Sequence, residues 1–224
     1  MVNKVGNELK NELETVARYW DDRAESMDSD CAKVDASLRA QRMRFEAFCQ
    51  YNDVEGKSVL DLGCGVGDFS AHLEARGIAC EYLGLDISRK MIDRCRERFP
   101  NRAFESGDIL FREFDRPFDF VVSFGIHNNV RLEKGAVLLE KTTRRQFELS
   151  TIAAHVSILT DRYREFAPHM QAWRAEDVLG MALNISPNVI LRHDYLPNDF
   201  CITLYREPLI DRRRDLLADQ RFIK

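Results

Sequence analysis

A short apolar run that ends in closely spaced glycines is the segment of this sequence best suited to hold a ligand. Residues 58–62 read Ser-Val-Leu-Asp-Leu, and glycines follow at positions 63, 65 and 67 before a segment of helical character. Glycine has no Cβ atom, so the backbone can turn tightly and a ligand can approach it closely. In a doubly wound sheet, ligands bind at the carboxyl ends of the strands, where this loop falls. The sequence therefore predicts a binding loop there.

Two classes of ligand compete for this loop. A dinucleotide fingerprint GxGxxG that starts at Gly63 needs a third glycine at position 68, where the chain has Asp68. A carboxylate at the N-terminus of the following helix would also repel the pyrophosphate that a helix dipole attracts. The pattern D-x-G-x-G-x-G, which starts at Asp61, favours a ligand without phosphates. A dinucleotide-dependent oxidoreductase stays open as an alternative.

Two more carboxylates follow the next two apolar runs. Asp86 ends the run Tyr-Leu-Gly-Leu, and a carboxylate there can accept two hydrogen bonds from a ribose diol. Asp108 follows the third run, where it could accept a hydrogen bond from an exocyclic adenine amine. Together with Asp61, these residues place an acid at the end of each of three consecutive strands. This arrangement favours a ligand with net positive character.

Strand-like and helix-like segments alternate along the chain, and this alternation predicts the elements that position these acids. Short strands separated by longer helices are typical of a parallel sheet covered on both faces. The link 195–199 is too short for a parallel crossover, so the last strand should run antiparallel to the one before it. We expect strands at 58–62, 81–85, 102–105, 118–124, 151–159, 188–194 and 200–206, and helices at 7–20, about 33–51, 67–76, 88–98, about 133–148 and 174–184.

The length of 224 residues and the absence of linkers or repeats predict one α/β domain. We expect a seven-stranded, mostly parallel sheet with the last strand antiparallel. Around it, residues 1–54 should form a helical N-terminal cap, 55–206 the ligand-binding core, and 207–224 a charged helical tail.

Composition narrows the possible partners and the compartment. The formal net charge is −4, whereas general duplex binding needs a basic face. Residues 1–10 hold no apolar leader core, and no apolar run approaches the ~18 residues of a membrane span. The six cysteines form no CxxC pair, so we expect reduced thiols and no bound metal. We therefore expect a cytoplasmic protein without a nucleic-acid or membrane partner; the oligomeric state stays open.

Four stretches of the chain carry a resemblance to a known family. VLDLGCGVGDFS, YLGLDIS, ESGDIL and FDFVVSFGIHNN occur in the order and register of the class I S-adenosylmethionine-dependent methyltransferases, which residues 55–206 resemble. The flanking stretches QRMRF and LRHDYLPNDF resemble a small bacterial subgroup of that family. The resemblance implies a Rossmann-like domain, S-adenosylmethionine as cofactor, and methyl transfer to an oxygen or nitrogen of a small-molecule acceptor. A non-catalytic cofactor-binding protein that acts through a partner is a further alternative.

The resemblance also implies roles for individual positions. The glycine loop would frame the methionine part of the cofactor, and the acid at the end of the second strand would bind the ribose. The acid after the third strand would contact the adenine edge, and the end of the fourth strand would lie beneath the sulfonium. Arg44 is a plausible partner for the cofactor's carboxylate, because guanidinium binds carboxylates in a fork. The expected cofactor-binding residues are Tyr19, Arg44, Asp61, Gly63, Gly65, Gly67, Asp86, Ile87, Met91, Asp108, Ile109, Phe124 and Gly125.

Acceptor contacts are expected from the ends of the fourth and fifth strands. Amino-group methyltransferases that act on DNA bases or glutamine carry Asx-Pro-Pro-aromatic after the fourth strand, and this chain does not. His127 is the best candidate for a general base, since imidazole titrates near neutral pH, although a loop or capping histidine is the plainer interpretation. Asn128 could orient a hydroxyl or cap a helix. In the loop after the fifth strand, we expect acceptor contacts from Asp161, Tyr163 and His169.

Overall fold

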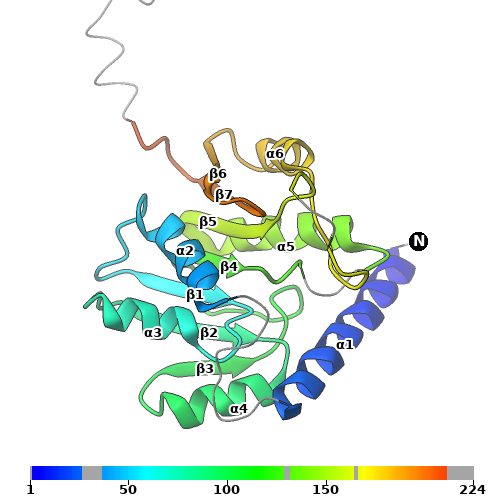
Figure 1. The fold of residues 1–224 in the computed structure, drawn as a ribbon, viewed down its shortest axis with the longest axis horizontal. Coiled ribbons are helices and arrows are strands. Elements are labelled where there is room, and N and C mark those ends of the chain that lie inside the picture. Colours follow the sequence, from blue (N-terminus) through cyan, green and yellow to red (C-terminus); the bar gives the residue numbers. More distant parts are fainter. Residues whose placement is uncertain (1, 27–36, 129–131, 164–165, 211–224) are drawn as a thin grey trace, which may run out of the picture.

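A computed structural model describes the chain over residues 2–26, 37–128, 132–163 and 166–210. Its seven strands form one sheet in the order β3-β2-β1-β4-β5-β7-β6 (Figure 1). The strands are β1 (Ser58–Leu62), β2 (Glu81–Asp86), β3 (Ala103–Ser106), β4 (Phe118–Phe124), β5 (Ser150–Leu159), β6 (Val189–Leu196) and β7 (Asp199–Tyr205). The helices are α1 (Val2–Ser26), α2 (Leu38–Cys49), α3 (Asp68–Ala75), α4 (Arg89–Arg98), α5 (Gly135–Leu149) and α6 (Ala175–Leu183).

Strand direction and order confirm the expected sheet. The first five strands pair in parallel, and β7 runs antiparallel to both β5 and β6. The chain steps outward from β1 to β3 and then returns to place β4 on the other side of β1. Such a reversal opens a crevice at the carboxyl ends of the strands, because the flanking crossovers leave in opposite directions. The glycine loop after β1 lies at that crevice.

Alternate residues of the central strands face two different layers of the core. Val59 packs into a cluster with Phe48, Phe69 and Ile92, which come from α2, α3 and α4. The neighbouring Leu60 faces the opposite layer, which includes Leu149 at the end of α5. Both faces of the sheet are therefore covered, as the apolar runs in these strands indicate.

The helix α1 closes one side of the crevice. Figure 1 shows it running along the edge of the fold from α5 to α4. Leu9 and Leu13 are buried and pack near Leu138 of α5. At the other end, Asp21 accepts a hydrogen bond from the Ser88 hydroxyl at 2.6 Å, next to the start of α4. The helix is thus held at both ends.

Several boundaries differ from those expected. α1 extends beyond 7–20 at both ends, and Ala24 in the C-terminal extension is buried beside Trp20. α2 begins at Leu38, after Ser37 caps it by accepting a hydrogen bond from the Ala40 amide at 3.2 Å. In the expected helical tail, residues 207–210 are not helical, and 211–224 lie outside the described residues.

The structure also bears on the expected reduced thiols and on the expected lack of a membrane span. The described cysteines are all free thiols, and Cys31 lies outside the described residues. Within the described ranges, none of the helices has the length and apolar character needed to cross a membrane.

His155 of β5 is a fully buried polar residue in the aromatic core. Its Nδ1 lies 2.8 Å from the Thr203 hydroxyl, and its ring centroid lies 5.0 Å from that of Phe48. Burial, reinforced by the positive charge of Arg192, lowers the pKa of His155 to about 3. The imidazole is therefore neutral in the folded protein.

We expect the His155→Gln variant to gain stability relative to wild type as pH falls. Below about pH 6.5 the unfolded wild-type chain takes up a proton at this histidine, whereas the folded chain does not. The free energy of unfolding of the wild type therefore falls relative to that of the variant, by about 1.4 kcal/mol for each pH unit. Urea unfolding between about pH 7 and pH 5 measures the difference. The exposed His169→Gln is the matched control, and equal pH slopes for H155Q and wild type would contradict the assignment.

Candidate functional site

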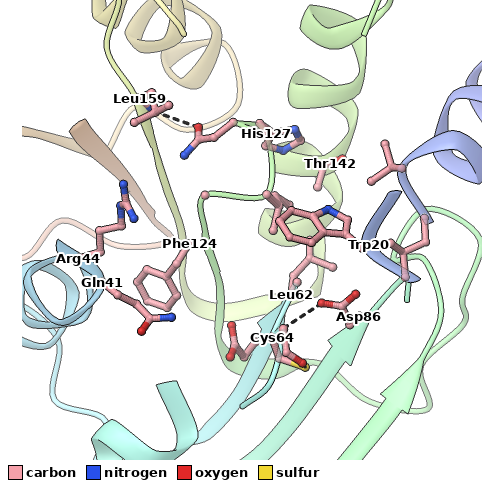
Figure 2. Close-up of a pocket in the computed structure, with 18 of the residues that line it drawn as sticks. Trp20, Gln41, Arg44, Leu62, Cys64, Asp86, Phe124, His127, Thr142 and Leu159 are labelled. Atoms are coloured by element: carbon pink, nitrogen blue, oxygen red, sulfur yellow. Dashed lines mark hydrogen bonds between the residues drawn. The ribbon is translucent and has the colours of Figure 1, made fainter. Parts of the chain in front are cut away.

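A cavity of about 550 Å3 lies at the carboxyl ends of the strands (Figure 2). Its volume lies within the range of small-molecule sites. The two N-terminal helices approach it from opposite sides, with Trp20 from α1 and with Gln41 and Arg44 from α2. The loops after β1 to β5 form the floor, and the β6–β7 turn completes the wall.

The three glycines of the loop after β1 have positive φ angles of 69°, 55° and 82°, but they serve different purposes. A Cβ atom on Gly63 would lie 2.1 Å from Cγ2 of Ile126, so a side chain there would collide with the β4 loop. A Cβ atom on Gly65 would meet nothing within 4 Å, so this residue exposes backbone to the cavity. Gly67 does not line the cavity; its missing Cβ leaves room for the ring of Phe99, 2.9 Å away. The structure thus places Gly67, an expected cofactor contact, outside the cavity lining and against Phe99.

Asp86 connects the end of β2 to this loop. Its Oδ2 accepts a hydrogen bond from the Gly65 amide at 2.9 Å, and its Oδ1 accepts one from the Ser88 amide at 2.8 Å. The first of these bonds is drawn in Figure 2. Burial raises the pKa of Asp86 to about 6, and the two amides oppose that rise. The carboxylate lines the cavity and is fixed in orientation before any ligand arrives.

Asp61 brings a second buried carboxylate to the cavity from β1. The Tyr82 hydroxyl donates to its Oδ2 at 2.6 Å. Burial is the main cause that raises the pKa of Asp61 to about 7, and the negative charges of Asp86 and Asp68 add to it. Bringing a positive charge close to these acids would favour their ionised form.

The loop after β3 supplies a third acid. Asp108 lines the cavity, and its Oδ1 accepts a hydrogen bond from the Leu110 amide at 2.7 Å. Burial raises the pKa of this carboxyl above its usual range. Apolar side chains lie around it on the cavity wall: Ile87, Met91 and Ile109. All the acids expected after β1, β2 and β3 thus meet at one end of one cavity.

The end of β4 brings Phe124, Gly125 and His127 to the cavity. His127 is buried, and its Nε2 has no hydrogen-bond partner among the described residues. Burial lowers the pKa of His127 to about 4. The expectation that this imidazole titrates near neutral pH is therefore wrong, because burial removes the water that would stabilise its charged form. A neutral imidazole nitrogen can still accept a proton from a ligand.

Asn128 also lines the cavity, but its side chain has a structural partner. Its Oδ1 accepts a hydrogen bond from the Leu159 amide at 3.0 Å, which ties the β4 loop to the end of β5 (Figure 2). Its backbone oxygen accepts another from the Gln171 amide at 2.7 Å. The residue therefore holds two neighbouring strand ends together.

The loop after β5 reaches the cavity through residues other than those expected. Asp161, Tyr163 and His169 are exposed and do not line it. The Trp173 amide donates to the Leu159 carbonyl at 2.9 Å, and the Asp161 amide donates to the Trp173 carbonyl at 3.0 Å. These bonds fold the end of the loop back onto β5, so its polar tip faces solvent. The lining residues from this loop are Met170, Gln171 and Trp173.

On α1, the residue that lines the cavity is the neighbour of the one expected. Trp20 lines the cavity together with Leu13 and Val16, whereas Tyr19 does not. Neighbouring helical residues point about 100° apart, so only one of the two aromatic rings can face the cavity. Tyr19 packs edge-on against Trp20, with ring centroids 5.1 Å apart.

Arg44 lines the cavity as expected, but it is already paired with a residue that the sequence did not single out. Its Nε donates to Oδ2 of Asp199 at 2.7 Å. Asp199 is fully buried at the start of β7, where the Ser157 hydroxyl donates to its Oδ1 at 3.1 Å. The short turn before the last strand was the available signal, because it places position 199 at the same sheet edge as the other acids.

Known proteins are similar to parts of this chain. Residues 59–145 match a family model described as a methyltransferase domain. A trans-aconitate 2-methyltransferase from Deinococcus radiodurans is 41% identical over 66 residues, which cover 29% of this chain and 25% of the relative. A magnesium-protoporphyrin O-methyltransferase from Rhodobacter capsulatus is 30% identical over 129 residues, which cover 52% of this chain and 56% of the relative. Across the curated relatives, the match spans 24% to 56% of the relative's own length.

Solved structures show the same fold. The crystal structure of a magnesium protoporphyrin IX methyltransferase from Synechocystis with bound S-adenosylmethionine superposes with a TM-score of 0.64 at 15% identity. The superposition covers 87% of this chain and 97% of that one. Residues 59–145 thus match a methyltransferase domain, and the described chain has the fold of the solved S-adenosylmethionine-bound methyltransferase.

Proposed function

We propose that this protein binds S-adenosylmethionine and transfers its methyl group to an oxygen or nitrogen atom of a small-molecule acceptor. The observation that carries the proposal is the pairing of Asp86 with the glycine loop inside the cavity. Its carboxylate is held by the amides of Gly65 and Ser88, and the backbone of Ile87 also contributes. A carboxylate has about four acceptor positions in all, so it can still accept a hydrogen bond from a ribose hydroxyl.

The other end of the cofactor fits the remaining acids. S-adenosylmethionine carries a sulfonium and an ammonium group, and Asp61 is a buried carboxylate whose charged form is costly until a cation approaches. Gly65 offers open backbone beside it. Asp108, with Ile109 next to it, offers an acceptor and an apolar wall to the adenine. When bound, the cofactor supplies an electrophilic methyl group.

The chain's own residues then position an acceptor and keep water away from it. The end of β4 contributes Phe124 and Ile126 to the cavity wall, and neither can compete for the methyl group. His127 lines the cavity, and its neutral imidazole is the candidate group for removal of a proton from an acceptor hydroxyl or amine. Holding the acceptor in line can supply much of the rate by itself.

The structure gives a reason to rank the oxidoreductase alternative lower. Asp68 is the first residue of α3, where a pyrophosphate would bind in a dinucleotide site. Its carboxylate accepts hydrogen bonds from Arg98 at 2.6 Å and from Gln41 at 3.0 Å. The helix N-terminus is thus already faced by an anion.

We expect S-adenosylhomocysteine to bind with a dissociation constant in the micromolar range, on the order of −8 kcal/mol. The chain has two tryptophans, Trp20 and Trp173, and both line the cavity. Tryptophan fluorescence should therefore change on binding, and calorimetry checks the affinity. Tighter binding of NADH than of S-adenosylhomocysteine would sink the proposal and favour the oxidoreductase.

We expect Asp86→Ala to weaken S-adenosylhomocysteine by about 1.5–3 kcal/mol, or tenfold or more, because hydrogen bonds to a charged acceptor are lost. Asp86→Asn should lose less, since its amide oxygen still accepts. Wild-type affinity should also fall as pH drops through about 6, where the carboxyl takes up a proton. Calorimetry across pH measures this, and the component centred there should be absent from D86N. A folded D86A with unchanged affinity would leave Asp86 as a loop residue only.

We expect His127→Ala to keep cofactor affinity while turnover falls by about 10²–10⁴-fold. The measurement is release of S-adenosylhomocysteine with whichever acceptor a screen of small hydroxy and amino compounds identifies. Because the pKa of His127 lies at about 4, the imidazole stays neutral at ordinary pH. Wild-type turnover should therefore show no decline from this group until pH approaches 4. Near-normal turnover by H127A would assign His127 a structural role.

A further inference from the structure

Arg44 uses only part of its hydrogen-bonding capacity within the described structure. Its side chain is 10% exposed, and Nε donates to Asp199 at 2.7 Å. No described residue forms a hydrogen bond or ion pair with Nη1 or Nη2 of this guanidinium. Those two nitrogens carry four N–H donors. Two of these donors are parallel and form a fork that can bind both oxygens of one carboxylate. A nearly buried guanidinium with an unused fork, in the wall of a cavity, indicates a site for an anion.

Asp199 holds that fork in a fixed orientation. Its own oxygens are occupied: Oδ2 by Arg44, and Oδ1 by the hydroxyls of Tyr195 and Ser157. Burial raises the pKa of Asp199, and Arg44 is the strongest influence in the opposite direction. Asp199 is therefore a positioning residue, which acts on a ligand only through Arg44.

The position of this pair in the sheet separates it from the cofactor's acids. Ser157 and Asp199 belong to β5 and β7, while Asp61 and Asp86 belong to β1 and β2. β4 lies between β1 and β5, and neighbouring strands are about 4.8 Å apart, so roughly 10 Å or more separate the two groups. Among the described residues that line the cavity, Arg44 is the one Arg or Lys. Arg44 is thus paired on the β5 and β7 side of β4, whereas Asp61 and Asp86 lie on the β1 and β2 side.

We propose that Arg44, positioned by Asp199, is the carboxylate-binding subsite for the methyl acceptor, which is a small carboxylic acid with an apolar body. The proposal rests on the proposed methyltransferase function and names its substrate class. The cavity wall also holds apolar side chains, among them Phe45, Phe124 and Leu196. An acid anchored at Arg44 would lay its apolar body along this wall. Its negative charge would stay far from the carboxylates that hold the cofactor.

Matched pairs of probes test the charge directly. With the protein saturated by S-adenosylhomocysteine, 4-hydroxybenzoate and its neutral methyl ester are titrated while tryptophan fluorescence is recorded, and calorimetry confirms the affinities. We expect the acid to bind about tenfold or more tightly than the ester, because a charge-assisted fork is available only to the carboxylate. Equal affinities, or binding by neither probe, overturn the proposal.

Variants of the pair identify the residue responsible. R44Q alone leaves Asp199 buried without its cation, so R44Q is combined with D199N to remove both charges together. We expect the double variant to bind the acid no more tightly than the ester. R44K keeps the positive charge but has no pair of parallel N–H donors, so it should lose most of the preference for the acid. R42Q, on the exposed side of α2, is the matched control and should behave as wild type.

The results distinguish the two sources of a carboxylate. If the double variant weakens S-adenosylhomocysteine and leaves 4-hydroxybenzoate unaffected, then Arg44 holds the cofactor's carboxylate and the acceptor proposal is overturned. Wild-type protein that does not bind S-adenosylhomocysteine at all contradicts the methyltransferase function instead. Circular dichroism and thermal unfolding of each variant show that a lost affinity does not reflect a lost fold.

Discussion

The hydrogen bond from the Gly65 amide to Asp86 depends on two parallel strands ending level with each other. Leu62 and Leu85 are paired in the register of β1 and β2, so the loop after β1 and the acid after β2 meet at one edge. The bond requires the backbone at Gly65 to adopt a positive φ, which glycine tolerates without strain. It also buries a carboxylate, and this burial raises its pKa. The shape, the charge and the orientation of the candidate site all follow from this arrangement.

Charge is distributed unevenly within the cavity. Four carboxylates line it at or near the ends of the first three strands, and one guanidinium lines it near β5 and β7: Asp61, Asp68, Asp86, Asp108 and Arg44. Burial makes each ionised group costly unless a partner compensates. Asp68 is compensated by Arg98 and Gln41. The other acids obtain part of that compensation from backbone amides and a tyrosine hydroxyl, and a bound cation would add to it. Arg44 is paired with Asp199 through Nε, and its Nη1 and Nη2 donors bond no described residue.

The sequence predicted the sheet well, because strand periodicity and the short link before β7 are local properties. All seven strands and their directions agree with the structure to within a few residues. Helix ends were less accurate, since α1 continues past its apolar stripe with no residue that stops it. The acids after β1, β2 and β3 were identified for a similar reason: strand order brings their positions to one edge whatever the details of packing.

The sequence by itself determined the fold class: a glycine loop, three acids in register, and alternating elements indicate a doubly wound sheet with a ligand site at the carboxyl ends of its strands. Only the tertiary structure decided which side chains face the cavity. Tyr19 and Trp20 are neighbours in sequence, but α1 can turn only one of them inward. The polar tip at Tyr163 faces solvent because hydrogen bonds fold the end of its loop onto β5. The pKa of His127 and the pairing of Arg44 with Asp199 depend on burial and on contacts across 155 residues of chain, and no local pattern encodes either of them.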